Sequence, residues 1–216
     1  MTRAIRIRSS PFICIEMALQ PELPYIIRRM EPRDISQVLL VDQKVFKDPW
    51  PKSVYIHELY FNVYARYFVL QVKSLLQFSP YWPWERQPLE KVHGFVGMRV
   101  QSGEGHISTL GVHPQWRGYG FGELLLITAL DQALIMNART VALEVRVSNT
   151  TAQSLYHKYE FVLLSSLPGY YQDGEDAFLL QLHLEGRYPD YRRKLEAQRQ
   201  DLERRCLEQS MVGRAS

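Results

Sequence analysis

Cysteine is scarce in this chain, and its scarcity excludes two kinds of stabilising site. Only Cys14 and Cys206 occur among the 216 residues, and they offer neither the spacing of a zinc site nor a disulfide framework. So few thiols are typical of proteins of the reducing cytosol. We therefore expect a cytoplasmic protein that is stabilised by its hydrophobic core, with no metal.

Long apolar runs and a large excess of one charge are also missing. No run reaches the ~18 residues that a membrane-spanning helix needs, so we expect no membrane partner. Lys and Arg together number 26 and Asp and Glu 23, which gives a formal net charge of +3. This mild excess permits an anionic ligand but does not call for nucleic acid, which usually needs a clustered basic face.

Sequence patterns divide the chain into a central domain and two extensions. Residues 1–24 join a basic start to an apolar stretch broken by Glu16, with no convincing signal-peptide cleavage site. We expect them to form a flexible extension. Residues 25–185 form the predicted domain, in which 73–91 are an insertion rich in aromatic residues and proline. Residues 186–216 are predicted to form a charged helix and a tail.

Hydrophobic periodicity predicts helices that alternate with strands in the central domain. The predicted strands cover residues 25–30, 65–72, 94–100, 106–112, 140–147, 161–165 and 177–183. The predicted helices cover residues 35–46, 53–61, 150–159 and 188–208, and a glycine-rich loop with its helix covers 118–137. Because the strands include hairpins, the fold class is α/β with a mixed sheet, not an all-parallel one.

The segment from Val112 to Leu126 is the most informative part of the chain. A strand ends at Pro114, a glycine-rich turn follows, and an apolar helix begins within a few residues. Free N–H groups at the start of a helix favour an anion, and Arg117 can add a phosphate contact. The segment lacks the Lys-Ser/Thr ending of a P-loop and the context of a dinucleotide fingerprint. It predicts a pyrophosphate site, and a glycine turn without a ligand stays open as the alternative.

The glycine loop resembles the Arg/Gln-x-x-Gly-x-Gly/Ala signature of the GNAT superfamily of N-acetyltransferases. A second frame starts at Gln115, but we prefer Arg117 because it stands three residues after Pro114. The resemblance implies the GNAT fold, a mixed and mostly antiparallel sheet with flanking helices, splayed at the acetyl-coenzyme A site. It implies acetyl-coenzyme A as cosubstrate, held by Leu110, Val112, Arg117, Gly118, Tyr119, Gly120, Phe121, Gly122 and Asn149.

Further motifs narrow the resemblance to the RimI-like branch, which acetylates protein N-termini. These motifs are Phe46-Lys-Asp-Pro-Trp50, Ala142-Leu-Glu-Val-Arg-Val-Ser-Asn149 and Gly169-Tyr-Tyr-Gln-Asp-Gly-Glu-Asp-Ala177. The resemblance implies a peptide slot lined by Phe46, Trp50, Tyr170 and Tyr171. It implies protein N-termini as partners, with ribosomal proteins as one candidate class, and we expect a monomer or a weak homodimer.

Glu144 and Tyr156 are the predicted catalytic pair. Attack of an amine on a thioester needs a proton acceptor, and the leaving thiolate benefits from a donor. Glu144 lies in an otherwise apolar strand, and Tyr156 lies in the next helix. In the RimI-like enzymes the matching glutamate is viewed as the base and the matching tyrosine as the acid. The structural alternatives are an ion pair of Glu144 with Arg146 and plain core packing of Tyr156.

Several other interpretations stay open at this point. The chain could acetylate lysine or small amines, or could be a non-catalytic acyl-coenzyme A-binding module. His113 and His157 are expected to have surface or packing roles. After the predicted helix that carries Tyr156, Glu160 stands where the family usually has a glycine, directly before Phe161. The C-terminal helix carries both signs of charge, so we favour a solvated helix with i,i+4 pairs. The alternative is an arm that contacts ribosomal RNA or another subunit.

Overall fold

The computed structural model describes residue 23 and residues 25–72 and 91–212, with side chains as far as Glu208. The predicted N-terminal extension, except for Leu23, lies outside the described residues. So does the aromatic and proline-rich insertion, except for Lys91.

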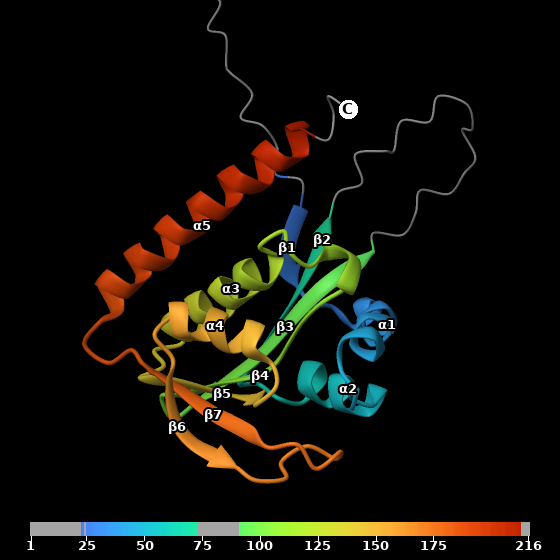
Figure 1. The fold of residues 1–216 in the computed structure, drawn as a ribbon, viewed down its shortest axis with the longest axis vertical. Coiled ribbons are helices and arrows are strands. Elements are labelled where there is room, and N and C mark those ends of the chain that lie inside the picture. The colour runs from blue at the N-terminus through green and yellow to red at the C-terminus, as the bar shows by residue number, and fades with distance from the viewer. Residues whose placement is uncertain (1–22, 24, 73–90, 213–216) are drawn as a thin grey trace, which may run out of the picture.

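Within the described residues, seven strands form one sheet in the order β1-β2-β3-β4-β5-β7-β6 (Figure 1). The strands are β1 (Tyr25–Arg29), β2 (Ala65–Val72), β3 (Val92–Gln101), β4 (Glu104–Val112), β5 (Thr140–Arg146), β6 (Val162–Leu167) and β7 (Ala177–His183). All neighbouring strands run antiparallel except β4 and β5, which run parallel. The predicted mixed, mostly antiparallel α/β sheet is therefore confirmed.

Helices cover both faces of this sheet (Figure 1). The helices are α1 (Ile35–Val45), α2 (Lys52–Tyr60), α3 (Phe121–Ile135), α4 (Thr150–Lys158) and α5 (Tyr188–Val212), with short 3-10 helices η1 (Pro32–Asp34) and η2 (Pro114–Trp116). Helices α1 and α2 pack on one face, and α3 and α4 pack on the other. Among the helices of the described residues, none is long and apolar enough to cross a membrane.

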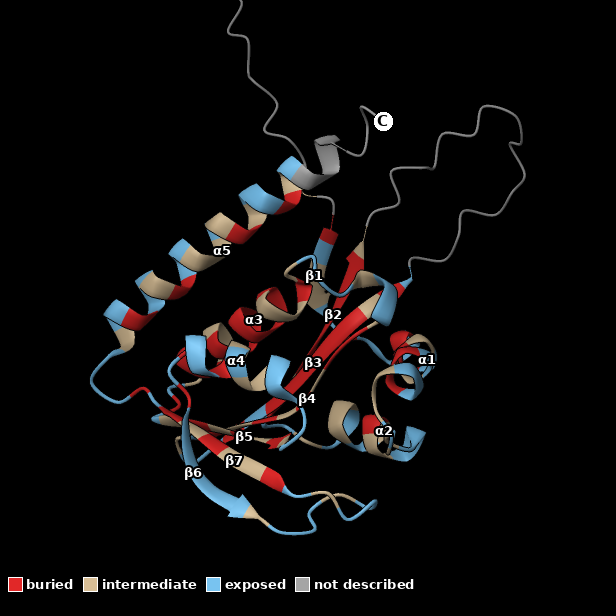
Figure 2. Ribbon diagram, in the orientation of Figure 1, coloured by how far each residue is buried: buried red, intermediate tan, exposed pale blue. Residues whose placement is uncertain are grey.

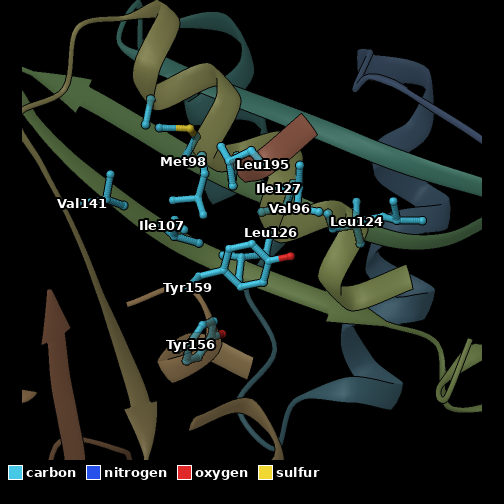
Figure 3. Packing of buried hydrophobic residues seen from close by; sticks show 14 of the residues in the cluster. Val96, Met98, Ile107, Leu124, Leu126, Ile127, Val141, Tyr156, Tyr159 and Leu195 are labelled. Carbon is cyan, nitrogen blue, oxygen red and sulfur yellow. The ribbon is translucent and has the colours of Figure 1, made fainter. Parts of the chain in front are cut away.

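The core on the α3 face is the larger of the two, and α3 is buried along most of its length (Figure 2). Leu124, Leu125, Leu126, Ile127 and Leu130 are all fully buried on this helix. A helix that is apolar on all sides needs cover on all sides. The sheet covers one side of α3, and α5 packs along another. Figure 3 shows Leu195 of α5 beside Ile127 of α3 in this core.

Helix α5 corrects the prediction of a solvated C-terminal helix. Tyr191, Leu195, Leu202 and Cys206 are at most 5% exposed and belong to the same core as α3. The expected pairs within the helix do occur on its outer face, for example from Arg205 to Asp201 and from Arg204 to Asp201. The helix is therefore amphipathic and docked, with only its outer face in solvent.

The β3–β4 hairpin is tighter than its sequence indicates. The two strands extend to Gln101 and from Glu104, so only Ser102 and Gly103 form the turn. Both have positive φ, 54° and 82°, which is the conformation of a two-residue type I′ turn. At the turn, β3 ends one residue later and β4 begins two residues earlier than predicted, because Ser102 takes the left-handed conformation that glycine more commonly adopts.

Strands β4 and β5 separate soon after they meet, and this separation positions the site. Their parallel pairing covers only three positions, from Glu104 opposite Thr140 to His106 opposite Ala142. Beyond these positions β4 continues to Val112 and β5 to Arg146 without further pairing to each other. The sheet is therefore splayed between the carboxyl ends of its two parallel strands, as the resemblance implies.

Candidate active site

A cleft of about 490 Å³ opens where β4 and β5 separate. Its walls come from both strands, the α1–α2 segment, the start of α4 and the β6–β7 loop. The predicted site residues that line it are Phe46, Trp50, Leu110, Glu144, Asn149, Tyr156, Tyr170 and Tyr171. The folded chain thus brings the proposed catalytic pair and the proposed substrate aromatics to one cavity. Val112 and residues 117–122 do not line this cleft; they lie at the end of β4, in the loop that follows it and in the first residues of α3.

Glu144 contacts a histidine that the sequence analysis missed. Its Oε2 atom lies 2.9 Å from His106 Nε2, and its Oε1 atom lies 3.2 Å from the same nitrogen. The alternative of a Glu144–Arg146 ion pair is wrong, because Arg146 binds other carboxylates. Both side chains are partly buried, at 20% exposure for Glu144 and 24% for His106.

Strand register explains why Glu144 and His106 meet. His106 lies opposite Ala142, and Glu144 lies two residues beyond Ala142 on the same face of β5. Ser108 Oγ lies 3.2 Å from the second ring nitrogen, Nδ1, so a tautomer protonated at Nε2 donates to Glu144 and accepts from Ser108. The contact could be found from the sequence only if the parallel register of β4 and β5 were known.

Tyr156 is both a packed core residue and a wall of the cleft. It is 8% exposed, and its ring centroid lies 5.8 Å from that of Phe161. Burial, with a smaller contribution from Tyr171, raises the pKa of the Tyr156 phenol to about 12. The side chain is therefore a protonated hydroxyl at neutral pH that lines the cleft.

Asn149 caps helix α4. Its Oδ1 atom accepts a hydrogen bond of 3.2 Å from the Ala152 N–H, which satisfies one of the free donors in the first turn. Asn149 also lines the cleft. Contact of Asn149 with coenzyme A stays a prediction.

The glycine loop has the geometry of an anion site. Gly118 and Gly120 have φ values of 84° and 80°, which L side chains rarely adopt. The earliest backbone bond of α3 runs from the Leu124 N–H to the Gly120 carbonyl over 3.0 Å. The amides that precede Leu124 in this turn are therefore not used by the helix and add to its positive dipole end. Free amides, two left-handed glycines and a helix start are a donor set that fits a diphosphate.

Arg117 lies at the entrance to this loop. Its Nε atom donates to the Val112 carbonyl over 3.3 Å, which leaves the guanidinium at the end of β4. A cation in this position adds positive potential beside the loop amides. The motif frame that starts at Arg117 stays a prediction.

Opposite walls of the cleft are joined by an ionic network around Arg146. Its guanidinium binds Asp48 of the α1–α2 segment at 3.0 Å, and Asp173 and Glu175 of the β6–β7 loop at 2.8 and 2.7 Å. It also lies 3.8 Å from the centroid of the Tyr171 ring. Hydrogen bonds from Ser148 and Arg146 lower the pKa of Glu175 to about 2. Hydrogen bonds from Arg146 and Lys47 lower the pKa of Asp173.

Asp42 supports the aromatic wall and was not singled out from the sequence. It is 1% exposed, and its carboxylate accepts hydrogen bonds from the Trp50 N–H at 2.7 Å and from the Tyr55 hydroxyl at 3.1 Å. Burial raises the pKa of Asp42. Because its two bonds fix the segment between α1 and α2, Asp42 positions Trp50 beside the cleft.

The two histidines that were expected to be structural do have local roles. His113 lies 3.0 Å from Lys44 Nζ and accepts a 3.3 Å bond from the Gln115 N–H. His157 Nδ1 lies 3.1 Å from the Phe161 carbonyl. Within the part of the chain that the structure describes, no group of three His, Cys, Asp or Glu side chains could hold a metal ion.

Glu160 is accommodated at the turn where the family usually has glycine. Its φ is 67°, so it takes the left-handed conformation despite its side chain. Its carboxylate binds both Arg187 and Lys194. These ion pairs connect the turn to the start of α5.

Comparisons with known proteins agree with this geometry. Residues 43–161 match the family described as Acetyltransferase (GNAT) family. A candidate ribosomal protein bS18-alanine N-acetyltransferase from Bacillus subtilis is 32% identical over 155 residues, which cover 71% of this chain and 92% of the relative. An N-alpha-acetyltransferase from Sulfurisphaera tokodaii is 30% identical over 159 residues, with 72% and 91% covered.

Solved structures share the fold. The ribosomal-protein-S18-alanine N-acetyltransferase from Escherichia coli superposes with a TM-score of 0.60 at 23% identity and covers 74% of this chain and 93% of that one. The NatC complex bound to Gag peptide and CoA contains a chain with a TM-score of 0.62 at 20% identity, with 75% and 99% covered.

Proposed function

The chain belongs to the acetyltransferase (GNAT) family, and from that premise we propose that it transfers the acetyl group of acetyl-coenzyme A to protein N-termini. The observation that carries the proposal is the cleft between β4 and β5, which Glu144 and Tyr156 both line. The α-amino group as acceptor is supported by the relatives named N-alpha-acetyltransferase. Ribosomal proteins as candidate substrates are suggested by the Bacillus subtilis relative.

The residues after β4 fit the cosubstrate. Acetyl-coenzyme A supplies an activated thioester at the end of a long arm that begins at a diphosphate. The amides of residues 118–122 and the Arg117 guanidinium bind the diphosphate in our proposal, and Asn149 contacts the arm. Among the strands of the described residues, none pairs with β4 on this side beyond His106. In our proposal the backbone of Leu110 and Val112 therefore binds the arm as an added strand, beside the Arg117 side chain that already donates to the Val112 carbonyl.

Glu144 accepts the proton of the attacking amine in this mechanism. An α-amino group has a pKa of roughly 7.7–8.0, so much of it is protonated at neutral pH and a base is needed beside it. His106 lies 2.9 Å from the Glu144 carboxylate and acts as a positioning residue that holds it toward the cleft. The free amine then attacks the thioester carbonyl directly, and a backbone N–H of β4 polarises the carbonyl oxygen.

Tyr156 donates a proton to the departing sulfur. Its raised pKa keeps the phenol protonated at neutral pH. Glu144 and Tyr156 belong to different elements that meet at the splay, one on β5 and the other on α4. The reaction proceeds in a ternary complex, without a covalent enzyme intermediate.

The acceptor peptide occupies the slot between two aromatic walls. Phe46 and Trp50 come from the α1–α2 segment, and Tyr170 and Tyr171 come from the β6–β7 loop. The Arg146 network joins these two segments, so it limits how far the slot can open. We propose that this limit favours an extended N-terminus. We also propose that the enzyme works in the cytoplasm as a monomer or weak homodimer.

A pair of peptides tests the acceptor. One peptide starts with a free alanine and contains an internal lysine, and its matched control has the same sequence with a blocked N-terminus. We expect thiol release from acetyl-coenzyme A with the free peptide only, and tandem mass spectrometry should place the acetyl group on the α-nitrogen.

Other outcomes would identify the alternatives. Turnover of the blocked peptide or of small diamines would indicate a lysine or small-amine acetyltransferase. Coenzyme A binding without turnover of any amine would indicate a non-catalytic binding module, and either result would overturn the proposal.

A further inference from the structure

The last turns of α5 lie against the glycine loop. A Cβ atom placed on Gly120 would lie 2.9 Å from Leu202 Cδ2, so the helix and the loop are in close contact. The Cys206 Sγ atom donates to the Tyr119 carbonyl over 3.4 Å. Leu202 and Cys206 are 2% and 5% exposed. Helix α5 lies outside residues 43–161, the segment that matches the family.

These contacts fix the orientation of one peptide group in the loop. The Tyr119 carbonyl and the Gly120 N–H belong to the same planar trans peptide, so they point in opposite directions. A donor on α5 that holds the carbonyl toward the helix therefore turns the N–H away from it. Burial raises the pKa of the Cys206 thiol, so the thiol stays protonated and keeps its donor.

A second contact holds the adjacent part of the loop. The Tyr25 hydroxyl of β1 donates to Glu203 of α5 over 3.3 Å, and the Tyr25 ring packs edge-on against Phe121 with centroids 5.6 Å apart. Both rings are nearly buried, at 6% and 4% exposure. Residues 119–121 are thus held between α5 and β1.

We propose that α5 is a positioning element of the cofactor site: Leu202 and Cys206 hold the glycine loop so that the Gly120 N–H points at the diphosphate of coenzyme A. This inference rests on the proposed function, because it takes the loop to be the diphosphate site. It adds that residues near the C-terminus, about 80 positions away in sequence, set the affinity of that site.

Variants of α5 separate positioning from stability. Leu202→Ala removes the side chain behind Gly120. Leu195→Ala is the matched control, since Leu195 is fully buried on the same helix but two turns away from Leu202. Cys206→Val removes the donor at similar volume, and Cys206→Ser keeps a donor. All four variants are purified as full chains and are assayed below their midpoints of thermal unfolding.

The readout compares two acetyl donors. Acetyl-coenzyme A carries the diphosphate, whereas S-acetylpantetheine has the same thioester and arm without it. For Leu202→Ala and Cys206→Val we expect the KM for acetyl-coenzyme A to rise about tenfold, the effect of losing one hydrogen bond to a charged group. We expect kcat, and kcat/KM with S-acetylpantetheine, to be unchanged. Leu195→Ala and Cys206→Ser should behave as the wild-type chain does with both donors.

Each outcome decides the inference. If Leu202→Ala and Leu195→Ala raise the KM for acetyl-coenzyme A equally, or if the loss is as large with S-acetylpantetheine, α5 is only structural and the inference is wrong. If Cys206→Val keeps the wild-type affinity for acetyl-coenzyme A, the thiol does not orient the peptide group between Tyr119 and Gly120, and that part of the inference is wrong. A wild-type chain that fails to use acetyl-coenzyme A would instead overturn the proposed function itself.

Discussion

The cofactor half and the substrate half of the candidate site differ in the groups that form them. The cofactor half is made of backbone amides, left-handed glycines and a buried tyrosine, and it rests on the large core around α3. The substrate half is made of aromatic side chains joined by an ionic network that is partly in solvent. The donors of the cofactor half are main-chain groups, which Leu202 and Cys206 orient in our proposal, whereas the substrate slot depends on the charges of Arg146 and its partner carboxylates.

This difference predicts how each half fails. Changes in the cofactor half should alter cosubstrate affinity through strain, and changes in the substrate half should alter the KM for the peptide. Changes of Glu144 and Tyr156, which both line the cleft, should alter kcat. Four substitutions test whether these three kinds of effect separate as expected, and they follow from the largest expected effect to the smallest.

Glu144→Gln should have the largest effect. The amide keeps the shape of the side chain but cannot accept the proton, so kcat should fall by about 10²- to 10⁴-fold, the usual contribution of a general base. The dissociation constant of coenzyme A, measured by calorimetry, should be the same for this variant as for the wild-type chain. Full turnover by this variant would remove Glu144 from the mechanism.

Tyr156→Phe should have a smaller effect on the same quantity. A thiol is a good leaving group compared with an alcohol, so loss of the donor should reduce kcat by about tenfold, below the usual range for acid catalysis. Because the pKa of Tyr156 is raised to about 12, the phenol stays protonated as pH rises to 10. The wild-type kcat should therefore show no decline from Tyr156 between pH 8 and 10, and a decline that disappears in the phenylalanine variant would contradict this assignment.

Gly120→Ala should weaken cosubstrate binding and leave the peptide slot intact. The left-handed conformation at φ 80° costs an alanine about 1–2 kcal/mol, and its Cβ would also collide with Leu202. We expect a lower unfolding midpoint and a raised KM for acetyl-coenzyme A. Gly174→Ala is the control, since Gly174 has φ 81° and open space around its Cβ position, in the β6–β7 loop. Equal effects of both variants on that KM would show that strain alone, and not the place in the loop, matters.

Arg146→Gln should have the smallest effect and should confine it to the peptide. The ion pairs of this network are partly exposed and screened by solvent, so the KM for the peptide should rise only about two- to fivefold. Asp173 and Glu175 have lowered pKa values, about 2 for Glu175, so these two carboxylates stay ionised as pH falls and lose their pairing only near those values. The ratio of variant to wild-type KM should be constant from pH 8 to pH 5, and a ratio that changes within this range would contradict the network.

The cofactor half could be predicted from sequence far better than the substrate half. Glycines in a turn indicate a left-handed backbone conformation, which Gly118 and Gly120 do adopt. The strand–proline–glycine–helix order places both within one short segment. Arg146 and His106 could not be assigned in the same way. Arg146 binds acids that are 98, 27 and 29 positions away, and the contact of His106 depends on the register of two strands that pair over only three positions.

Helix α5 shows a related limit. The leucine spacing of this segment indicates a helix, and its many charges favour a helix in solvent. Its own sequence does not identify the element against which it packs. The partner was indicated by α3, whose apolar residues surround the helix axis and require cover on the side away from the sheet. The docking of α5 therefore depends on the apolar side of α3 that the sheet does not cover, and the folded chain shows that α5 is the element that covers it.

Calorimetric titration of acetyl-coenzyme A into the purified chain tests the central claim most directly, because every step of the mechanism depends on that complex. We predict saturable binding with one ligand per chain, and a dissociation constant in the range of about 1 μM to 1 mM that is usual for enzyme substrates. No heat of binding at millimolar ligand, together with no thiol release when an alanine-starting peptide is added, would contradict the account.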